Sequence, residues 1–287
     1  MKTRQILVDQ VRLLLDFIKS EFEVDVKIGA ELEFYVKSDS VKQIDEILNQ
    51  IPSADCAVEK EKGWNQYECV FSHERSIFDL LECISKTKSF IKTICRQYAC
   101  KAIFDAKPYP DDYGSSLHLH ISLHDKSGSN VFSTEATKQT VLGKVIAGIL
   151  DISEESIYLM CRSPDEYLRF APKFLSPTNV SWGANNRTTL IRIPMSPLGS
   201  KRIEFRLPSA ATEPAMAVYV ALIGVIHGLS KDLDLPPQIY GNAFEAIYEL
   251  LPLPQSLEEV KNIFEKKATI LHYSRILTPK LILDNYL

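Results

Sequence analysis

The sequence contains no hydrophobic run close to the ~20 residues that a membrane-spanning helix requires. It also lacks a strong excess of either charge, since the formal net charge is −4 over 287 residues. Such a chain has no broad electrostatic attraction to nucleic acid or to an anionic membrane. Its first residues begin an amphipathic helical pattern and not the hydrophobic stretch of a secretion signal. These absences predict a cytoplasmic protein without nucleic-acid or membrane partners.

Paired cysteines and glycine-rich phosphate loops are missing as well. None of the six cysteines belongs to a Cys-x-x-Cys pair, which argues against a zinc site and favours buried free thiols. Neither Gly-x-x-x-x-Gly-Lys nor Gly-x-Gly-x-x-Gly occurs. The sequence therefore gives no support for a P-loop or a dinucleotide-binding fold.

Hydrophobic residues make up 45% of the chain, enough for a large core. Their helical spacing predicts helices at about 4–20, after Ser40, from Ser72 to about 100, from Thr134 to about 160, after Ser163, from Thr212 to about 230, and after Ser256. Strand patterns occur at about 26–36, 64–71, 117–123, 188–194 and 201–207. Because the strands do not alternate regularly with helices, we predict one α+β domain over residues 1–287 with a largely antiparallel sheet.

Three of the predicted strands carry charged or imidazole groups on one face only. Successive side chains of a strand point to opposite faces. One face would therefore present Glu31, Glu33, His118, His120, Arg202, Glu204 and Arg206. The opposite face would present Leu32, Phe34, Leu117, Leu119, Ile203 and Phe205. A polar face of this kind is costly unless its groups bind one another or a ligand.

The polar residues are of the type that binds hard divalent cations. Carboxylates with one imidazole suit Mg²⁺ or Mn²⁺, whereas zinc would favour cysteine or several histidines. The six candidate ligands are Glu31, Glu33, Glu61, Glu68, His118 and Glu204. Six ligands divide into two sets of three for two ions. Arginines accompany them at 169, 187, 192, 202 and 206, and cations beside metals are typical of phosphoryl transfer.

Each motif alone has a simpler explanation. A lone Glu-x-Glu on a strand is usually a solvated edge, and Arg-x-Glu-x-Arg is most often a ladder of surface salt bridges. One histidine of a His-x-His pair often only satisfies a neighbour, and Glu61 and Glu68 could be ordinary loop acids. The coincidence of three such strands, each with a strongly hydrophobic opposite face, favours a functional site.

Five segments occur in an order and spacing that resemble the catalytic domain of the glutamine synthetase family. They are Gly29-Ala-Glu-Leu-Glu-Phe34, Glu61-Lys-Gly-Trp-Asn-Gln-Tyr-Glu68, the Lys107-Pro108 pair followed by Gly114-Ser-Ser-Leu-His-Leu-His-Ile-Ser-Leu123, Asn186-Arg-Thr-Thr-Leu-Ile-Arg-Ile-Pro194, and Arg202-Ile-Glu-Phe-Arg-Leu-Pro208. The resemblance extends over almost the whole chain and implies a curved, half-barrel sheet with a metal-binding polar face, packed by helices.

The resemblance also implies roles for individual residues. Glu33, Glu61 and Glu68 would hold one metal near the acyl substrate, and Glu31, His118 and Glu204 would hold a second on the nucleotide phosphates. The nucleotide would contact His120, Ser122 and Arg192, and the transferring phosphate would contact Arg187 with Arg192. The substrate amino acid would be held by Arg169, Arg206 and Gly114.

The implied reaction is an ATP-dependent ligation. ATP, as co-substrate with two Mg²⁺ or Mn²⁺ ions, converts a glutamate-like carboxylate to an acyl phosphate, which an amine or ammonia then attacks. Two other hypotheses stay open: a non-catalytic relative that binds a nucleotide or an amino acid, and a phosphotransferase acting on a guanidino or amine group.

The sequence departs from the family pattern at several places. Tyr113 replaces an asparagine and Ser116 a glycine in the loop that holds glutamate, and Leu175 stands where the family has a glutamate that helps to deprotonate ammonium. A larger amine is therefore an alternative to ammonia. The family's small N-terminal β-domain is absent from this sequence, so the usual family ring is not expected, whereas a homo-oligomer of another kind stays open.

Overall fold

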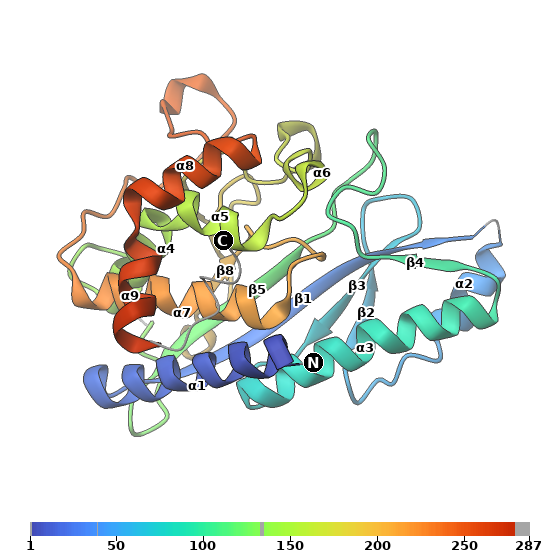
Figure 1. Cartoon of the computed structure of the whole chain (residues 1–287), viewed down its shortest axis with the longest axis horizontal. Helices are drawn as coiled ribbons and strands as arrows, with labels where there is room; N and C mark the ends of the chain where they lie inside the picture. The colour runs from blue at the N-terminus through green and yellow to red at the C-terminus, as the bar shows by residue number, and fades with distance from the viewer. Residues whose placement is uncertain (1, 39, 133–134, 279–287) are drawn as a thin grey trace.

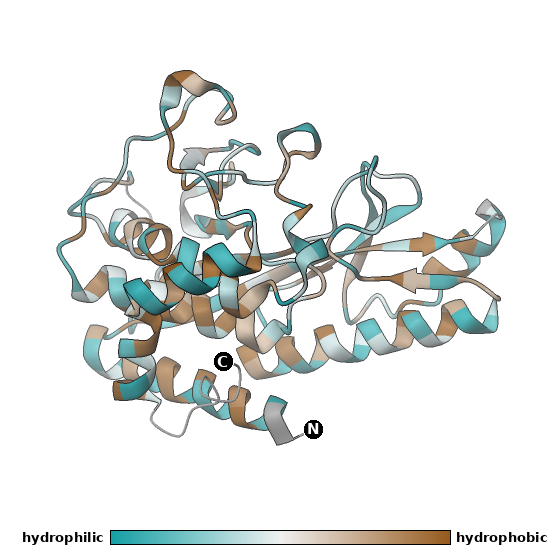
Figure 2. Ribbon diagram, turned by 45° about the horizontal axis from the view of Figure 1, so that its top comes forward, coloured by the Kyte–Doolittle hydropathy of each residue, from teal (hydrophilic) through white to brown (hydrophobic). Residues whose placement is uncertain are grey.

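Three long helices cover one face of the sheet (Figure 1). They are α1 (Lys2–Phe22), α3 (Ile77–Gln97) and α7 (Pro214–Ser230) in a computed structural model that describes residues 2–38, 40–132 and 135–278. Leu7, Val11, Leu14 and Ile18 of α1 recur at helical spacing and are buried. Figure 2 shows hydrophobic and hydrophilic residues alternating along α1 and α3, as expected for helices with one buried side.

The strands are β1 (Asp25–Lys37), β2 (Ala57–Lys60), β3 (Gln66–Phe71), β4 (Lys101–Ile103), β5 (Leu117–His124), β6 (Trp182–Ala184), β7 (Ile191–Ile193) and β8 (Ile203–Phe205). The other helices are α2 (Val41–Leu48), α4 (Val141–Asp151), α5 (Ser153–Met160), α6 (Pro164–Tyr167), α8 (Leu257–Lys267) and α9 (Thr269–Leu277). Short 3₁₀ helices are η1 (Pro172–Phe174), η2 (Leu198–Ser200) and η3 (Ala246–Tyr248).

The strand order is β2-β3-β1-β5-β8-β7-β6, and β4 pairs with the C-terminal part of β1. All these pairs are antiparallel except β6 with β7. The predicted α+β fold with a largely antiparallel sheet packed by helices is therefore confirmed.

The register of the sheet aligns the polar positions of neighbouring strands. Glu33 of β1 is opposite Glu68 of β3, and Glu31 is opposite His118 of β5. His120 of β5 is opposite Glu204 of β8. Directly opposite side chains lie on the same face of a sheet, so the register places these groups side by side.

The hydrophobic positions fill the other face, as the alternation predicted. All six predicted core residues belong to one cluster of buried side chains and are fully buried: Leu32, Phe34, Leu117, Leu119, Ile203 and Phe205. The six cysteines are buried free thiols, also as predicted. No helix among the described residues is long and apolar enough to cross a membrane.

Several predicted boundaries were wrong. The helix predicted from Ser72 begins at Ile77, because the hydroxyl of Ser76 accepts a hydrogen bond from the Asp79 amide at 3.1 Å and caps it. The predicted start at Thr134 lies outside the described residues, and the region up to 160 forms two helices, α4 and α5. Three short strands and α9 were not predicted.

Candidate functional site

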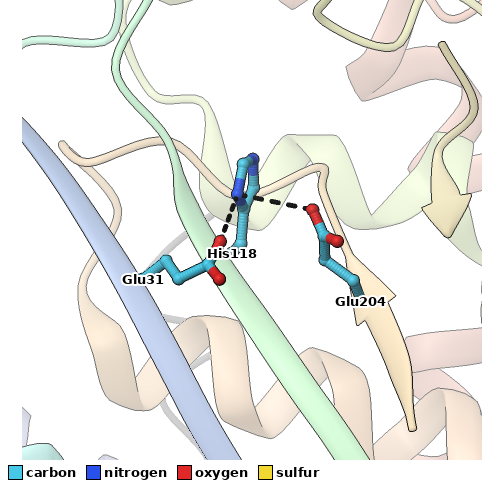
Figure 3. Close-up of side chains that lie close together, drawn as sticks. All are labelled: Glu31, His118 and Glu204. Carbon is cyan, nitrogen blue, oxygen red and sulfur yellow. Dashed lines mark hydrogen bonds and ion pairs between the residues drawn. The ribbon is translucent and has the colours of Figure 1, made fainter. Parts of the chain in front are cut away.

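Glu31, His118 and Glu204 meet in the middle of the polar face and come from three neighbouring strands, β1, β5 and β8. Figure 3 shows the three side chains pointing toward one another. His118 Nδ1 lies 3.2 Å from Glu31 Oε2 and 3.6 Å from Glu204 Oε1. One potential ligand atom from each residue lies within 4.8 Å of the others. We call these residues the histidine triad.

A second group consists of Glu33, Glu61 and Glu68, which we call the carboxylate triad. One carboxylate oxygen from each also lies within 4.8 Å of the others. Glu33 and Glu68 come from the paired strands β1 and β3, and Glu61 comes from the turn that joins β2 to β3. The structure thus brings the six predicted ligands together in the two predicted sets of three.

Hydrogen bonds from the surrounding chain fix the position of Glu33. The backbone amide of Ser116 donates to Glu33 Oε2 at 2.7 Å, and the Gln66 amide donates to the same oxygen at 3.4 Å. Gln66 also donates to the Gly114 carbonyl oxygen at 2.8 Å. The carboxylate triad is therefore tied to the loop that precedes β5.

The carboxylate triad concentrates negative charge in a buried place. Burial raises the pKa of Glu33, and the nearby charge of Glu61 adds to this effect. Burial and the neighbouring carboxylates, Glu31 first among them, raise the pKa of Glu68 to about 9. Within the described part of the chain, no lysine or arginine forms an ion pair with Glu33, Glu61 or Glu68. Hard divalent cations favour such a set of oxygen ligands, so the triad fits one.

The histidine triad has the opposite electrostatic character. Burial would raise the pKa of Glu31, but the imidazoles of His118 and His120 outweigh it and lower that pKa well below its usual range. Burial likewise opposes ionisation of Glu204, yet His118, Arg206, His120 and Arg192 lower its pKa to about 2. Both carboxylates are therefore ionised at neutral pH and available as metal ligands.

Two arginines flank the Glu204 carboxylate. Arg192 donates to Glu204 Oε2 and Arg206 donates to Oε1, each at 2.7 Å. Arg206 also donates to the carbonyl oxygens of Leu175 and Arg187, both at 3.0 Å. Arg206 therefore fixes the backbone of two loops next to the site. The side chain of Arg187 is exposed and lines the pocket.

Arg169 lies behind the pocket and not on its surface. Its side chain is 1% exposed, and its guanidinium donates to Ser116 Oγ at 3.2 Å and to the Leu207 carbonyl oxygen. The side chain packs so closely on Gly114 that a Cβ at this position would lie 2.5 Å from Arg169 Cγ. Gly114 itself lines the pocket. The predicted substrate-binding role of Arg169 stays a prediction, and in this structure the residue supports the Gly114 loop.

A pocket of about 110 Å³ contains both triads together with Arg187, Arg192 and Arg206. Its lining also includes Tyr113, Phe174 and Leu175, which form a less polar wall. The rings of Tyr113 and Phe174 meet edge to face at 5.6 Å between centroids. One pocket thus combines cation ligands, guanidinium groups and a hydrophobic wall.

A second pocket of about 240 Å³ adjoins the first, because Glu31 lines both. It is lined by His120, Ser122 and Arg202. The His120 Nε2 atom lies 2.8 Å from Glu31 Oε1, and its Nδ1 accepts a hydrogen bond from Arg202 at 3.1 Å. Two of the three residues predicted to contact the nucleotide, His120 and Ser122, therefore line this pocket, whereas Arg192 lines the first pocket.

Some residues of the site were not predicted. Gln66 lies on the same face of β3 as Glu68, so strict alternation along that strand could have identified it. Asn185, whose side chain accepts a hydrogen bond from Arg192 at 2.7 Å, lies in a loop with positive φ. Phe174 ends the short helix η1, directly before Leu175. Neither Asn185 nor Phe174 belongs to a stretch with helical or strand periodicity, so no sequence pattern predicts them.

Comparisons with known proteins agree with this geometry. Residues 35–287 match the family described as glutamine synthetase, catalytic domain. The chain is 32% identical over 220 residues to gamma-glutamylputrescine synthetase PuuA of Escherichia coli strain K12, covering 76% of this chain and 46% of that protein. It is 30% identical over 234 residues to a glutamate–isopropylamine ligase of Pseudomonas sp, covering 80% of this chain and 50% of that protein.

A glutamine synthetase of Pyrococcus woesei is 29% identical over 234 residues, which cover 78% of this chain and 53% of that protein. The chain thus spans about half the length of the curated relatives it matches. A solved structure titled as the GmaS/ADP complex, conformation 1, superposes with a TM-score of 0.77 at 17% identity, over 92% of this chain and 68% of that one. That likeness concerns the fold.

Proposed function

Because the chain belongs to the glutamine synthetase family, we propose that it catalyses ATP-dependent joining of the γ-carboxylate of glutamate to an amine. The observation that carries the proposal is the pairing of the two triads in one pocket with Arg187 and Arg192. Curated relatives named as glutamate–amine ligases and glutamine synthetases support the same reaction class.

The two triads are assigned to two Mg²⁺ or Mn²⁺ ions. The carboxylate triad would hold one ion near the acyl substrate, and the histidine triad would hold the other on the nucleotide phosphates. When bound, such ions neutralise phosphate charge and orient the reacting oxygens. The second pocket, with His120 and Ser122, adjoins the histidine triad, which supports a nucleotide there with its phosphates directed toward Glu31.

Arg187 and Arg192 are assigned to the phosphoryl group in transfer. The γ-phosphoryl group of ATP moves to an oxygen of the glutamate carboxylate, which forms an acyl phosphate and releases ADP. The amine nitrogen then attacks the carbonyl carbon, the carbon–oxygen bond to phosphate breaks, and the nitrogen loses a proton. Positively charged guanidinium groups stabilise the charge on the transferring group. Arg206 and Gly114 are assigned to the amino acid substrate.

The amine acceptor is proposed to carry a hydrocarbon body. Leu175 lines the pocket beside Phe174 and Tyr113, so this wall offers hydrophobic contact and no carboxylate at position 175 to deprotonate ammonium. Packing an added methylene in such a pocket stabilises a bound amine by about 1–3 kcal/mol.

Isotope transfer tests the reaction directly. The protein is incubated with Mg²⁺, ATP, amines of increasing length and glutamate labelled with ¹⁸O in its γ-carboxylate. The proposal predicts a γ-glutamyl amide, ADP, and one ¹⁸O atom in the released phosphate, because an acyl phosphate passes a carboxylate oxygen to phosphate. Glu204→Gln should lose at least about 100-fold in rate, while Glu258→Gln, an exposed control on α8, should not.

Three results would contradict the proposal. ADP release at background with every amine, despite measurable ATP binding, would favour a non-catalytic binding protein. A phosphorylated amine or guanidino product without ¹⁸O in phosphate would favour a phosphotransferase. Amide formation without ¹⁸O transfer would exclude the acyl phosphate.

A further inference from the structure

A basic groove lies between α3 and β4, away from both triads. Helix α3 runs alongside the short strand β4 (Figure 1). The groove has a volume of about 580 Å³, within the range of small-molecule sites. Its lining includes four cationic residues: Lys88, Lys92, Arg96 and Lys101. We call this feature the basic groove, and neither triad contributes a residue to it.

The cations of the basic groove are poorly compensated. Asp105 is the single acidic residue in the lining. Within residues 2–38, 40–132 and 135–278, none of the four cations forms an ion pair with a carboxylate. Like charges gathered in a concave surface focus the electrostatic potential and raise the local concentration of counter-ions.

Lys88 lies at the inner end of this group. Its Nζ donates to the Ala210 carbonyl oxygen at 2.6 Å and lies 5.2 Å from the centroid of the Phe104 ring, with Lys92 Nζ at 5.5 Å from the same ring. Burial, followed by the charge of Lys92, lowers the pKa of Lys88 to about 8. The ring attracts each ammonium group, but the two positive charges repel each other, and a bound anion would relieve that repulsion.

The spacing of the cations indicates an extended anion. Lys88, Lys92 and Arg96 are four residues apart on α3, so their backbone positions rise by ~6 Å for each step along one side of the helix. A single phosphate group could reach two of them, whereas two or more linked phosphates could contact all three. Arginine and lysine are the side chains that bind phosphate oxygens most strongly.

We propose that the basic groove binds a small polyanion with two or more linked phosphate groups, at a site separate from the ligase pocket. The ligand is either free polyphosphate or the phosphate tail of a nucleotide, since both present the same oxygens. The proposal does not depend on the ligase reaction, because it concerns residues that line neither catalytic pocket.

Calorimetric titration with sodium pyrophosphate tests this site. Divalent metals are removed with chelator, and ionic strength is held constant with sodium chloride. We expect saturable binding that weakens at least tenfold in Lys92→Glu/Arg96→Glu, two exposed positions whose reversal leaves the core intact. The matched control, Lys86→Glu/Lys266→Glu, makes the same change in net charge at exposed sites outside the groove and should bind as the wild type does.

A second arm separates the basic groove from the ligase pocket and distinguishes the two ligand sources. Arg187→Ala should keep pyrophosphate binding. A component of ADP binding that is tighter than pyrophosphate binding and is lost in Lys92→Glu/Arg96→Glu would identify a nucleotide as the ligand, whereas ADP binding that survives in that variant belongs to the pocket of His120 and Ser122. No saturable heat in the wild type would overturn the proposal. Equal weakening in the groove and control variants, or loss of binding in Arg187→Ala alone, would overturn it as well.

Discussion

Glu68 carries an electrostatic conflict that a bound cation would remove. Its carboxyl is mostly buried and faces three other acids of the site, and its pKa is raised to about 9 from an ordinary value of 4.5. At neutral pH the metal-free group is therefore mostly protonated, and a cation must displace its proton. Metal affinity at the carboxylate triad should accordingly increase as pH rises toward 9.

The same shift predicts how the stability of the metal-free protein depends on pH. Because the folded-state pKa of Glu68 lies above its unfolded value, the folded state binds the extra proton between about pH 4.5 and 9. The contribution of Glu68 to the free energy of unfolding is fully present below pH 4.5 and is lost as the pH rises from 4.5 to 9. When the pH is raised from 6 to 9 in the presence of chelator, the melting temperature of Glu68→Gln should therefore decrease less than that of the wild type.

Thermal melts of Glu68→Gln, wild type and the exposed control Glu258→Gln would measure this effect. The control should follow the wild-type pH dependence, because Glu258 lies on the outer surface of α8. A Glu68→Gln protein with the wild-type pH dependence would contradict the electrostatic argument for the carboxylate triad.

Leu175 is expected to decide between ammonia and a larger amine. Its backbone has φ 58°, in the left-handed region, and glutamate tolerates this geometry about as well as leucine because neither is branched at Cβ. Leu175→Glu should raise kcat/KM for ammonium relative to an alkylamine at least tenfold, since a general base typically contributes about 10²–10⁴ in rate. Leu175→Met, of similar volume, should keep the wild-type ratio. An unchanged ratio in Leu175→Glu would exclude this role.

At the level of elements, the buried helix α7 packs against α4 with almost no space between their backbones. A Cβ at Gly148 of α4 would lie 2.3 Å from the Gly224 carbonyl oxygen and 2.3 Å from the Gly228 nitrogen of α7. Atoms cannot approach so closely, so a side chain there must push the helices apart. Because α7 supports the core side of the sheet, its position also supports the strands that carry the triads.

Gly148→Ala should therefore destabilise the protein although alanine is the better helix former. We expect a loss of about 1–3 kcal/mol in the free energy of unfolding, or more, measured by denaturant titration. Gly199→Ala is the matched control, because a Cβ at Gly199 would meet no atom within 4 Å. Equal stability of the two variants would show that the contact between α4 and α7 tolerates a side chain.

Period-two alternation predicted the strands that build the site, because β1, β5 and β8 each have one hydrophobic and one polar face. β4, β6 and β8 are each three residues long. The alternation around β8 continues through Arg202-Ile-Glu-Phe-Arg-Leu207, whereas no such pattern surrounds β4 or β6. The break between α4 and α5 was missed although it carries a signal, because Glu154 and Glu155 place two acids in the first turn of α5. Helix starts were predicted correctly at Ser40 and Ser256, because each serine caps the first turn of its helix.

The sequence predicted the ligands of the site and singled out Tyr113 and Leu175, but it did not predict that these two residues form one hydrophobic wall with Phe174. Glu33 and Glu68 lie in strands whose alternation reveals which side chains share a face. Phe174 is the last residue of η1, and Leu175 follows it. Phe174 contacts Tyr113, and the Leu175 carbonyl oxygen accepts a hydrogen bond from Arg206, which is distant in the sequence. Contacts of this kind are tertiary and leave no pattern in the sequence.

At the scale of the whole molecule, the structure separates two charge environments. Acidic and imidazole groups gather on the polar face of the sheet, around the two triads. Lysines and an arginine gather at the basic groove between α3 and β4. The net charge of −4 is a sum over both environments. It therefore predicts no broad attraction to nucleic acid or an anionic membrane, but gives no information about a local site.

The central claim is that the polar face binds two divalent ions, one in each triad. Anomalous X-ray diffraction from crystals grown with Mn²⁺ and ADP tests it most directly, because it locates manganese without reference to activity. We predict two peaks, one among Glu31, His118 and Glu204 and one among Glu33, Glu61 and Glu68. Crystals that bind ADP but show no manganese peak at either triad would contradict the account.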